Sequence, residues 1–187
     1  MIEIEKKFQV DNFDSIRMKL ASGDFDVIED YPAKTQSDEY FNHRQLRFEL
    51  LDIALRIRRV NDRKILTFKG PNQDATTKIR TEIEIDLTKD DDQKMSQMFL
   101  GMGMHSVAKV NKNRDTSLIR WQGSNVEVCL DEVTEVGCFV ELEIVAENDE
   151  DVPAAKSKLE ALAEAFGLSD STTISYLELL LRSRGQL

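Results

Sequence analysis

The sequence predicts an α+β fold in which roughly eight to ten mostly antiparallel strands form a closed or nearly closed sheet, with about four helices packed outside. Apolar and polar residues alternate in one segment after another, which is the period of a strand buried on one face. These segments form hairpins that alternate with single amphipathic helices. The 187 residues, 41% of them apolar, suffice for one packed core, so a single domain over residues 1–187 is expected.

The first strand is expected over residues 1–8. Its alternation places Glu3, Glu5 and Lys7 on one face and Ile4 and Phe8 on the other. The elements expected next are a helix over 12–21, strands over 25–29 and 35–41 with an interruption at Tyr31-Pro32, a polar loop to residue 52, a hairpin of strands 54–58 and 65–69 with its turn at Asn61-Asp62, and a strand over 78–85.

The second half begins with a helix to about residue 100, for which Thr88 and Asp91 resemble a capping box. Its apolar residues recur at helical spacing and are predicted to lie in the core: Met95, Met98, Phe99 and Met102. Strands are then expected over 105–112, 116–121, 125–131 and 138–145, followed by a helix from Asp151 or Pro153 to residue 166 and a last helix over 173–182.

Charge and composition exclude several classes of partner. A net charge of -10 and a pI near 4.8 repel polyanions, so we expect no binding to nucleic acid or to an anionic membrane. With no leader and no long apolar run, a cytoplasmic location is expected. Cys129 and Cys138 fall in neighbouring strands without a CxxC spacing and are interpreted as reduced packing residues; His43 and His105 are isolated and receive no role.

The polar faces of the predicted strands gather both signs of charge. They carry Glu3, Glu5, Lys7, Arg56, Arg58, Lys69, Arg80, Glu82, Glu84, Lys112, Arg114, Asp131, Glu141 and Glu143. If the sheet is open, these residues form a solvated surface whose ion pairs contribute little. If the sheet closes, they line a tunnel whose basic residues require an anion, and carboxylates beside that anion favour a bridging Mg²⁺ or Mn²⁺. The second alternative predicts a metal–polyphosphate site.

The opening motif and seven later ones also carry a family resemblance. Glu3-x-Glu5-x-Lys7 resembles the ExExK signature of the CYTH superfamily, which groups class IV adenylate cyclases with thiamine triphosphatases and tripolyphosphatases. The order of the later motifs is similar to that of the family: Leu55-Arg-Ile-Arg58, Thr67-Phe-Lys-Gly70, Arg80-x-Glu82-x-Glu84, Lys112-Asn-Arg114, Leu130-Asp131, Gly137-x-Phe139-x-Glu-Leu-Glu143 and Ser175-Tyr176. The resemblance covers nearly the whole chain and implies a closed eight-stranded antiparallel β-barrel, the triphosphate tunnel.

The resemblance also implies roles for these residues. Metal-associated positions are Glu3, Glu5, Glu141 and Glu143, supplemented by Glu82, Glu84 and Asp131; the cofactor is Mg²⁺ or Mn²⁺. Triphosphate-binding positions are Lys7, Arg56, Arg58, Lys69, Arg80, Lys112 and Arg114. The catalytic set is Glu3, Glu5, Arg58, Glu141 and Glu143. Because the first motif starts at residue 3, removal of residues 1–5 is expected to damage activity before it damages folding.

Three functions remain open at this stage. The run from Ser175 to Leu180 is more similar to the bacterial class IV cyclases than to the thiamine triphosphatases. This similarity implies conversion of ATP to 3′,5′-cyclic AMP and pyrophosphate. The alternatives are a metal-dependent triphosphatase, acting on tripolyphosphate, thiamine triphosphate or a nucleoside triphosphate, and a non-catalytic nucleotide or polyphosphate binder. Tyr176 is interpreted as a helix residue that packs on the barrel wall. The resemblance further suggests a homodimer, although the chain has no coiled-coil heptads.

Overall fold

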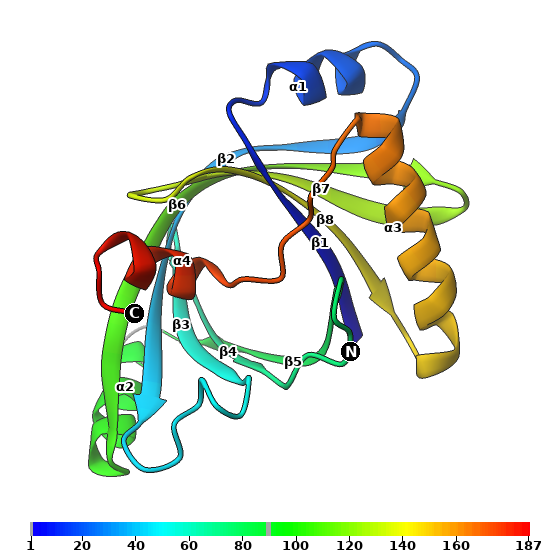
Figure 1. Ribbon diagram of the computed structural model, residues 1–187. Coiled ribbons are helices and arrows are strands. Elements are labelled where there is room, and N and C mark those ends of the chain that lie inside the picture. The colour runs from blue at the N-terminus through cyan, green and yellow to red at the C-terminus, as the bar shows by residue number, and fades with distance from the viewer. Residues whose placement is uncertain (1, 89–90) are drawn as a thin grey trace.

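The eight strands close into one antiparallel barrel, as the sequence predicts (Figure 1). The computed structural model describes residues 2–88 and 91–187, so Met1, where the first predicted strand begins, lies outside the described residues. The strands are β1 (Ile2–Val10), β2 (Asp26–His43), β3 (Ala54–Val60), β4 (Arg63–Lys69), β5 (Lys78–Leu87), β6 (Met104–Trp121), β7 (Ser124–Val133) and β8 (Gly137–Ala146). They pair around the barrel in the order β1-β5-β4-β3-β2-β6-β7-β8.

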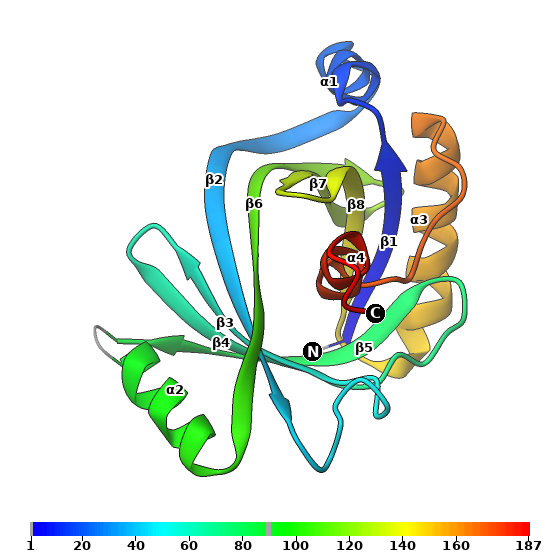
Figure 2. The ribbon, with the colours of Figure 1, turned by 60° about the vertical axis from the view of Figure 1, so that its left-hand side comes forward.

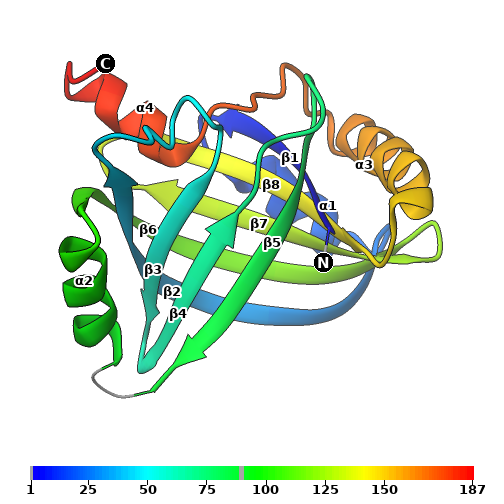
Figure 3. The same cartoon turned by 90° about the horizontal axis from the view of Figure 1, so that it is seen from below.

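Three of the four α-helices pack outside the barrel, while the last lies across one mouth. The helices are α1 (Asp14–Ala21), α2 (Asp91–Gly101), α3 (Val152–Phe166) and α4 (Tyr176–Ser183), with a 3₁₀ turn at Asp149–Asp151 before α3. Helices α2 and α3 lie on opposite sides of the barrel (Figure 3). No described helix is both long enough and apolar enough to cross a bilayer.

Helix α4 lies within the ring of strands when the barrel is viewed end-on (Figure 1), and Figure 2 shows it beside β8 and β1 in a view turned by 60°. Its apolar residues Tyr176 and Leu180 pack against Tyr40, Val110 and Phe139 of β2, β6 and β8. These three strand residues face inward at this end of the barrel, so the position of α4 follows from burial of an apolar surface that the other helices do not cover. The chain reaches α4 through a bridge in which Thr172 N donates to Lys7 O at 2.8 Å.

Two pairs of predicted strands are single 18-residue strands, which corrects the count from as many as ten to eight. The predicted strands 25–29 and 35–41 both belong to β2, and 105–112 and 116–121 both belong to β6. Pro32 has no N–H to donate, and β2 accommodates it where the β2–β6 register shifts between Tyr31 and Lys34. Polar residues at the middle of β6 resemble a turn in sequence, but they alternate within one strand: Lys112 and Arg114 line the cavity, whereas Asn113 is exposed.

The main core lies between the barrel and α3, and it confirms the predicted division of strand faces. Ile4 and Leu142 are fully buried in one cluster with Leu159 and Leu162 of α3. Since alternate residues point to opposite faces, this leaves Lys7 and the glutamates of β1 and β8 inside the barrel, whereas Lys6 lies outside, 3.6 Å from Glu160 of α3.

The predicted apolar stripe of α2 is only partly buried. Phe99 packs against Phe41 and Ile57, with their cluster extended by Met95. Met98 and Met102, however, are 57% and 53% exposed, so their assignment to the core is wrong. Helix α2 buries one narrow edge, and these two residues lie outside it. The predicted cap is confirmed, because Thr88 N donates to the Asp91 carboxylate at 3.1 Å.

Residues 2–5 close the barrel. They supply all four register pairs between β1 and β5, from Ile2 opposite Thr81 to Glu5 opposite Lys78. Ile4 is also part of the buried core. Removing these residues would therefore open the barrel, which argues against the expectation that activity would suffer before folding.

Candidate active site in the barrel interior

The charged residues predicted to share one face line a single cavity of about 1730 Å³ inside the barrel. Eight of the basic side chains that line it form the candidate site: Lys7, Arg56, Arg58, Lys69, Lys78, Arg80, Lys112 and Arg114. The carboxylates that accompany them are Glu3, Glu5, Glu82, Glu84, Glu141 and Glu143 on the cavity wall, and Asp38 and Asp131 behind it. All residues of the predicted site are thus brought to one interior, although they come from seven strands.

On one side of the cavity, Asp38 of β2 holds two arginines of β3. Arg58 donates to both oxygens of Asp38 at 2.7 Å, and Arg56 Nη1 donates to Oδ2 at 3.1 Å. Burial alone would raise the pKa of Asp38, but Arg56 and Arg58 hold it well below its usual value. The Nε–H of Arg56 is buried and has no acceptor among the described residues, and the same is true of Arg80 Nε.

Next around the wall, Lys69 bridges two carboxylates. Its Nζ lies 2.8 Å from Glu3 and 2.7 Å from Glu82. Burial, together with the nearby Glu3, raises the pKa of Glu82 to about 7. Burial alone would raise the pKa of Glu3, but Lys69, a hydrogen bond with Glu82 and the charge of Arg56 together lower it. The Glu3 carboxylate is therefore ionised at neutral pH, while Glu82 gains and loses its proton near neutral pH.

The deepest part of the wall is formed by β1, β5 and β8. Lys78 donates to Glu5 Oε1 at 2.9 Å, while Lys7 Nζ lies 3.6 Å from Glu5 and 3.4 Å from Glu141. Burial lowers the pKa of Lys78 to about 8, despite the attraction of Glu5. Lys7 also donates to Ile174 O at 3.0 Å.

Beside this wall, on β7, Asp131 is completely buried and both of its oxygens are occupied. Arg114 donates to both oxygens, at 2.6 and 2.5 Å, Lys112 donates at 2.8 Å and the hydroxyl of Tyr176 donates at 2.9 Å. Arg114 also contacts Glu141, and its Nη1 donates to Glu143 at 3.3 Å. Asp131 thus fixes the positions of two basic residues and one tyrosine.

A divalent cation fits one acidic group in this interior. Glu5, Glu141 and Glu143 each offer a ligand oxygen, and these oxygens lie within 4.8 Å of one another. An all-oxygen carboxylate set is the donor chemistry that Mg²⁺ and Mn²⁺ prefer. Of the other predicted metal-associated residues, Glu3 and Glu82 pair with Lys69, Asp131 pairs as described, and Glu84 is exposed, where it accepts from Thr67 at 3.1 Å.

Carboxylates of the tunnel neutralise most of its basic residues. The prediction that these basic residues require an anion therefore applies to only a few of them. Each of the eight basic residues has a carboxylate within 4.0 Å. The weakest such contact is that of Arg80, whose nearest carboxylate is the exposed Asp52 at 4.0 Å. The demand for an anion is therefore concentrated at Arg56 and Arg80, the two arginines with a buried, unpartnered Nε–H.

Sequence reasoning missed Lys78 and Asp38 of this interior and gave Tyr176 a packing role alone. Lys78 lies two positions before Arg80, so the alternation that identified Arg80 also indicates Lys78. Asp38 is revealed only by the pairing of β2 with β3, which sets it opposite Arg58. Tyr176 packs on Phe139 as expected, but its ring also faces the ammonium groups of Lys7 and Lys112, at 4.1 and 5.0 Å from the ring centre.

The sequence and fold of this chain are similar to those of known proteins. The CYTH domain model matches residues 1–176. A Methanocaldococcus jannaschii protein named "Putative adenylate cyclase" is 32% identical over 181 residues, which are 96% of this chain and 98% of that protein. A solved protein structure from Pyrococcus horikoshii is also 32% identical, with a TM-score of 0.83 over 97% of this chain and 99% of that one.

A further solved structure shares the fold at lower identity. It is a Hippeastrum protein described as a "Putative adenylyl cyclase" with a dominant triphosphatase activity, with a TM-score of 0.67 and 19% identity over 99% of this chain and 97% of that one. The family model spans all eight strands, the acidic group and the basic residues around it. The chain belongs to the CYTH domain family.

Proposed function

We propose that this chain converts ATP to 3′,5′-cyclic AMP and pyrophosphate inside the tunnel, with Mg²⁺ or Mn²⁺ as cofactor. CYTH enzymes depend on a divalent metal and act on triphosphates such as ATP or tripolyphosphate. The observation that carries the proposal is the presence, in one cavity, of eight basic side chains around the acidic group Glu5, Glu141 and Glu143. The name of the Methanocaldococcus jannaschii relative supports cyclisation as the reaction.

The size of the cavity favours a triphosphate that carries an organic group. Ligand pockets usually have volumes of about 300–1,000 Å³. The tunnel cavity, at about 1730 Å³, exceeds this range. A triphosphate gripped by the basic residues therefore leaves room for a nucleoside in the same cavity.

Substrate binding would exchange the ion pairs of the tunnel rather than add charge to an empty site. Arg56 and Arg80 would donate their unpartnered Nε–H groups to phosphate oxygens, and Arg58 and Lys69 would turn from their carboxylates toward the same anion. The carboxylates of Glu5, Glu141 and Glu143 would hold the metal, which neutralises phosphate charge when bound. Asp131 would keep Lys112 and Arg114 in place rather than bind the metal.

In the proposed reaction, the ribose 3′-oxygen forms a bond to the α-phosphorus while the bond from that phosphorus to the bridging oxygen breaks. The 3′-hydroxyl proton is transferred to the pyrophosphate that leaves. Negative charge develops on this leaving group, and Arg56, Arg58 and Lys69, which line the cavity, would neutralise it. The walls of the barrel hold both ends of one molecule close together, which is the positioning that an intramolecular attack requires.

A triphosphatase is the second candidate. Its supporting observation is the Hippeastrum protein, which has the same fold and a dominant triphosphatase activity. The same basic residues would grip the terminal phosphates, and water rather than the ribose hydroxyl would attack the terminal phosphorus to release orthophosphate. The two candidates share the triphosphate site and differ only in the attacking group and the phosphorus attacked.

Product analysis distinguishes the candidates. The protein is incubated separately with ATP, tripolyphosphate and thiamine triphosphate, in Mg²⁺ and in Mn²⁺. We expect cyclic AMP and pyrophosphate from ATP, without orthophosphate. Orthophosphate without a cyclic product would reject the cyclase and support the triphosphatase, while tight binding without turnover would reject both in favour of a non-catalytic binder. Glu141→Gln should abolish turnover, and the exposed Glu147→Gln, beyond the end of the same strand, is the control.

A further inference from the structure

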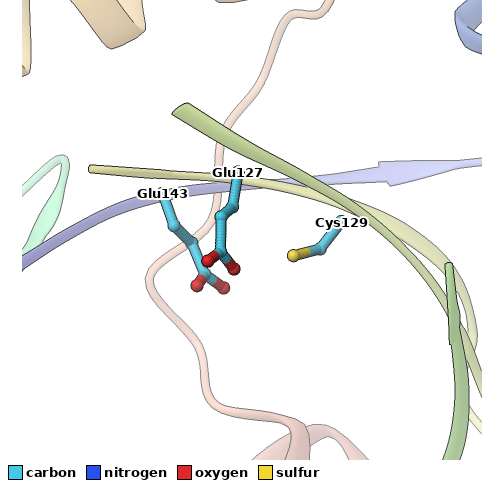
Figure 4. A group of neighbouring side chains, drawn as sticks. All are labelled: Glu127, Cys129 and Glu143. Atoms are coloured by element: carbon cyan, nitrogen blue, oxygen red, sulfur yellow. The ribbon is translucent and has the colours of Figure 1, made fainter. Parts of the chain in front are cut away.

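A second group of potential metal ligands lies on the barrel wall beside the acidic group already described. It consists of Glu127 and Cys129 of β7 and Glu143 of β8 (Figure 4). Their ligand atoms, two carboxylate oxygens and one sulfur, lie within 4.8 Å of one another. Glu127 pairs directly with Glu143 in the β7–β8 register, and Cys129 is two residues further along the same face of β7.

The carboxylates of Glu127 and Glu143 face each other, and no basic side chain of the described residues pairs with Glu127. Like charges directly opposite on paired strands destabilise a sheet. Glu143 has Arg114 at 3.3 Å, but Glu127 has no hydrogen bond or ion pair within the described part of the chain. Glu127 is exposed and could extend into water, yet its carboxylate points toward that of Glu143 (Figure 4). A bound cation would favour the ionised form of both carboxylates and draw them together.

Cys129 is a thiol between Glu127 and Asp131 on the inward face of β7. It is 0% exposed, and its one polar contact is Thr116 Oγ1 at 3.8 Å, which is long for a hydrogen bond. Its neighbours Val128 and Leu130 point outward into the core under α3, whereas Cys129 belongs to none of the apolar clusters of the described residues. The sulfur therefore faces Glu127 and Glu143 rather than the core.

We propose that Glu127, Cys129 and Glu143 form a binding site for Zn²⁺, a divalent cation that accepts sulfur ligands. This site is distinct from the all-oxygen group that suits Mg²⁺ or Mn²⁺. Zn²⁺ accepts thiolate and carboxylate ligands together, and three protein ligands leave one position of its tetrahedron open. Mg²⁺ binds oxygen ligands and rarely sulfur, so it is not expected to bind a set that includes the Cys129 thiolate. Binding releases the thiol proton to solvent as the metal–sulfur bond forms.

Glu143 belongs to both groups, so the two sites are coupled. A Zn²⁺ ion held by Cys129 and Glu127 draws the Glu143 carboxylate from Glu5 and Glu141. Zn²⁺ should therefore weaken the binding of Mn²⁺ at the all-oxygen group. This coupling concerns metal binding alone and stands whether the chain is a cyclase, a hydrolase or a binder.

The test uses Cd²⁺, whose bond to a thiolate gives an ultraviolet charge-transfer band, followed by competition with Zn²⁺. We expect one Cd²⁺ per chain, a band that Zn²⁺ removes, and loss of the band in Cys129→Ser. The matched control is Cys138→Ser, in which the other free cysteine, which lies on the outward face of β8, is replaced. Glu127→Gln, at an exposed position where it leaves the fold intact, should weaken Cd²⁺ binding by about tenfold or more.

Three results would overturn the proposal. The first is the absence of the band in the wild-type protein, and the second is a band that survives Cys129→Ser or disappears in Cys138→Ser. The third is unchanged Cd²⁺ affinity in Glu127→Gln, which would mean that the thiol binds alone. Because Glu127→Gln does not disturb the core, this third comparison decides the matter even if Cys129→Ser fails to fold.

Discussion

The substitution Asp38→Asn isolates the contribution of the carboxylate that holds Arg56 and Arg58. Asp38 is 2% exposed and accepts three hydrogen bonds from these two guanidinium groups. Asparagine preserves the shape of the side chain and removes the negative charge. The two arginines are then left with Glu82, 3.7 Å from Arg56, as the nearest remaining carboxylate in their salt bridges.

The expected cost follows from burial. Removing one partner of a buried ion pair destabilises a protein by about 3–5 kcal/mol, because the remaining charge is uncompensated. For a chain of this length, each kcal/mol lowers the melting temperature by about 2–4 °C. We therefore expect Asp38→Asn to melt about 6–20 °C below the wild-type protein when no ligand is present.

Tripolyphosphate should reverse much of this loss. In the wild-type protein, phosphate oxygens compete with Asp38 for Arg56 and Arg58, whereas in the variant they meet two arginines without that partner. The increase in melting temperature on adding tripolyphosphate, measured by scanning calorimetry with a chelator present, should therefore be larger for Asp38→Asn than for the wild-type protein.

The control is Asp86→Asn, which breaks a 2.8 Å salt bridge to Arg63. Its two side chains are 71% and 70% exposed, so the loss should be below about 1 kcal/mol. The reasoning is refuted if Asp38→Asn melts as the control does, or if tripolyphosphate stabilises the variant no more than the wild-type protein.

Three further predictions follow from the same geometry. The pKa of Lys78 is about 8 because the residue is buried, so its ammonium loses charge as the pH rises through 8; affinity for metal-free tripolyphosphate, measured by calorimetry, should fall over that range, and the fall should flatten in Lys78→Met. Deleting residues 2–5 removes all pairing of β1 with β5, so cooperative unfolding should be lost, whereas a stable variant would contradict that role. Chelation of the divalent metal should abolish turnover and Glu5→Gln should raise the Mn²⁺ concentration required to restore it; turnover in excess chelator would contradict the metal assignment.

The sequence predicted the fold class and the strand faces because alternation is a local property of the chain. It could not establish closure of the barrel, which the family resemblance supplied and the pairing of β1 with both β5 and β8 confirms. It also divided β2 and β6 wrongly, since Pro32 in β2 and the polar run around Asn113 in β6 resemble breaks between strands. The homodimer and the cytoplasmic location stay predictions.

The membership of the candidate site was predicted better than its internal pairing. Every predicted residue lines or adjoins the cavity. Which carboxylates stand together depends on register, because Glu5 meets Glu143 across β1 and β8, whereas Asp131 meets Arg114 across β6 and β7. Asp38 and Tyr176 depend on contacts between segments distant in sequence, which no local pattern contains.

The most direct test of the account is a crystal structure with Mn²⁺ and a non-hydrolysable ATP analogue, in which the anomalous signal locates the metal. We expect a manganese peak between Glu5, Glu141 and Glu143, with triphosphate oxygens on Arg56, Arg58 and Arg80 and the nucleoside in the same cavity. A triphosphate bound outside the barrel, or a manganese ion with none of these three carboxylates as ligands, would contradict the account.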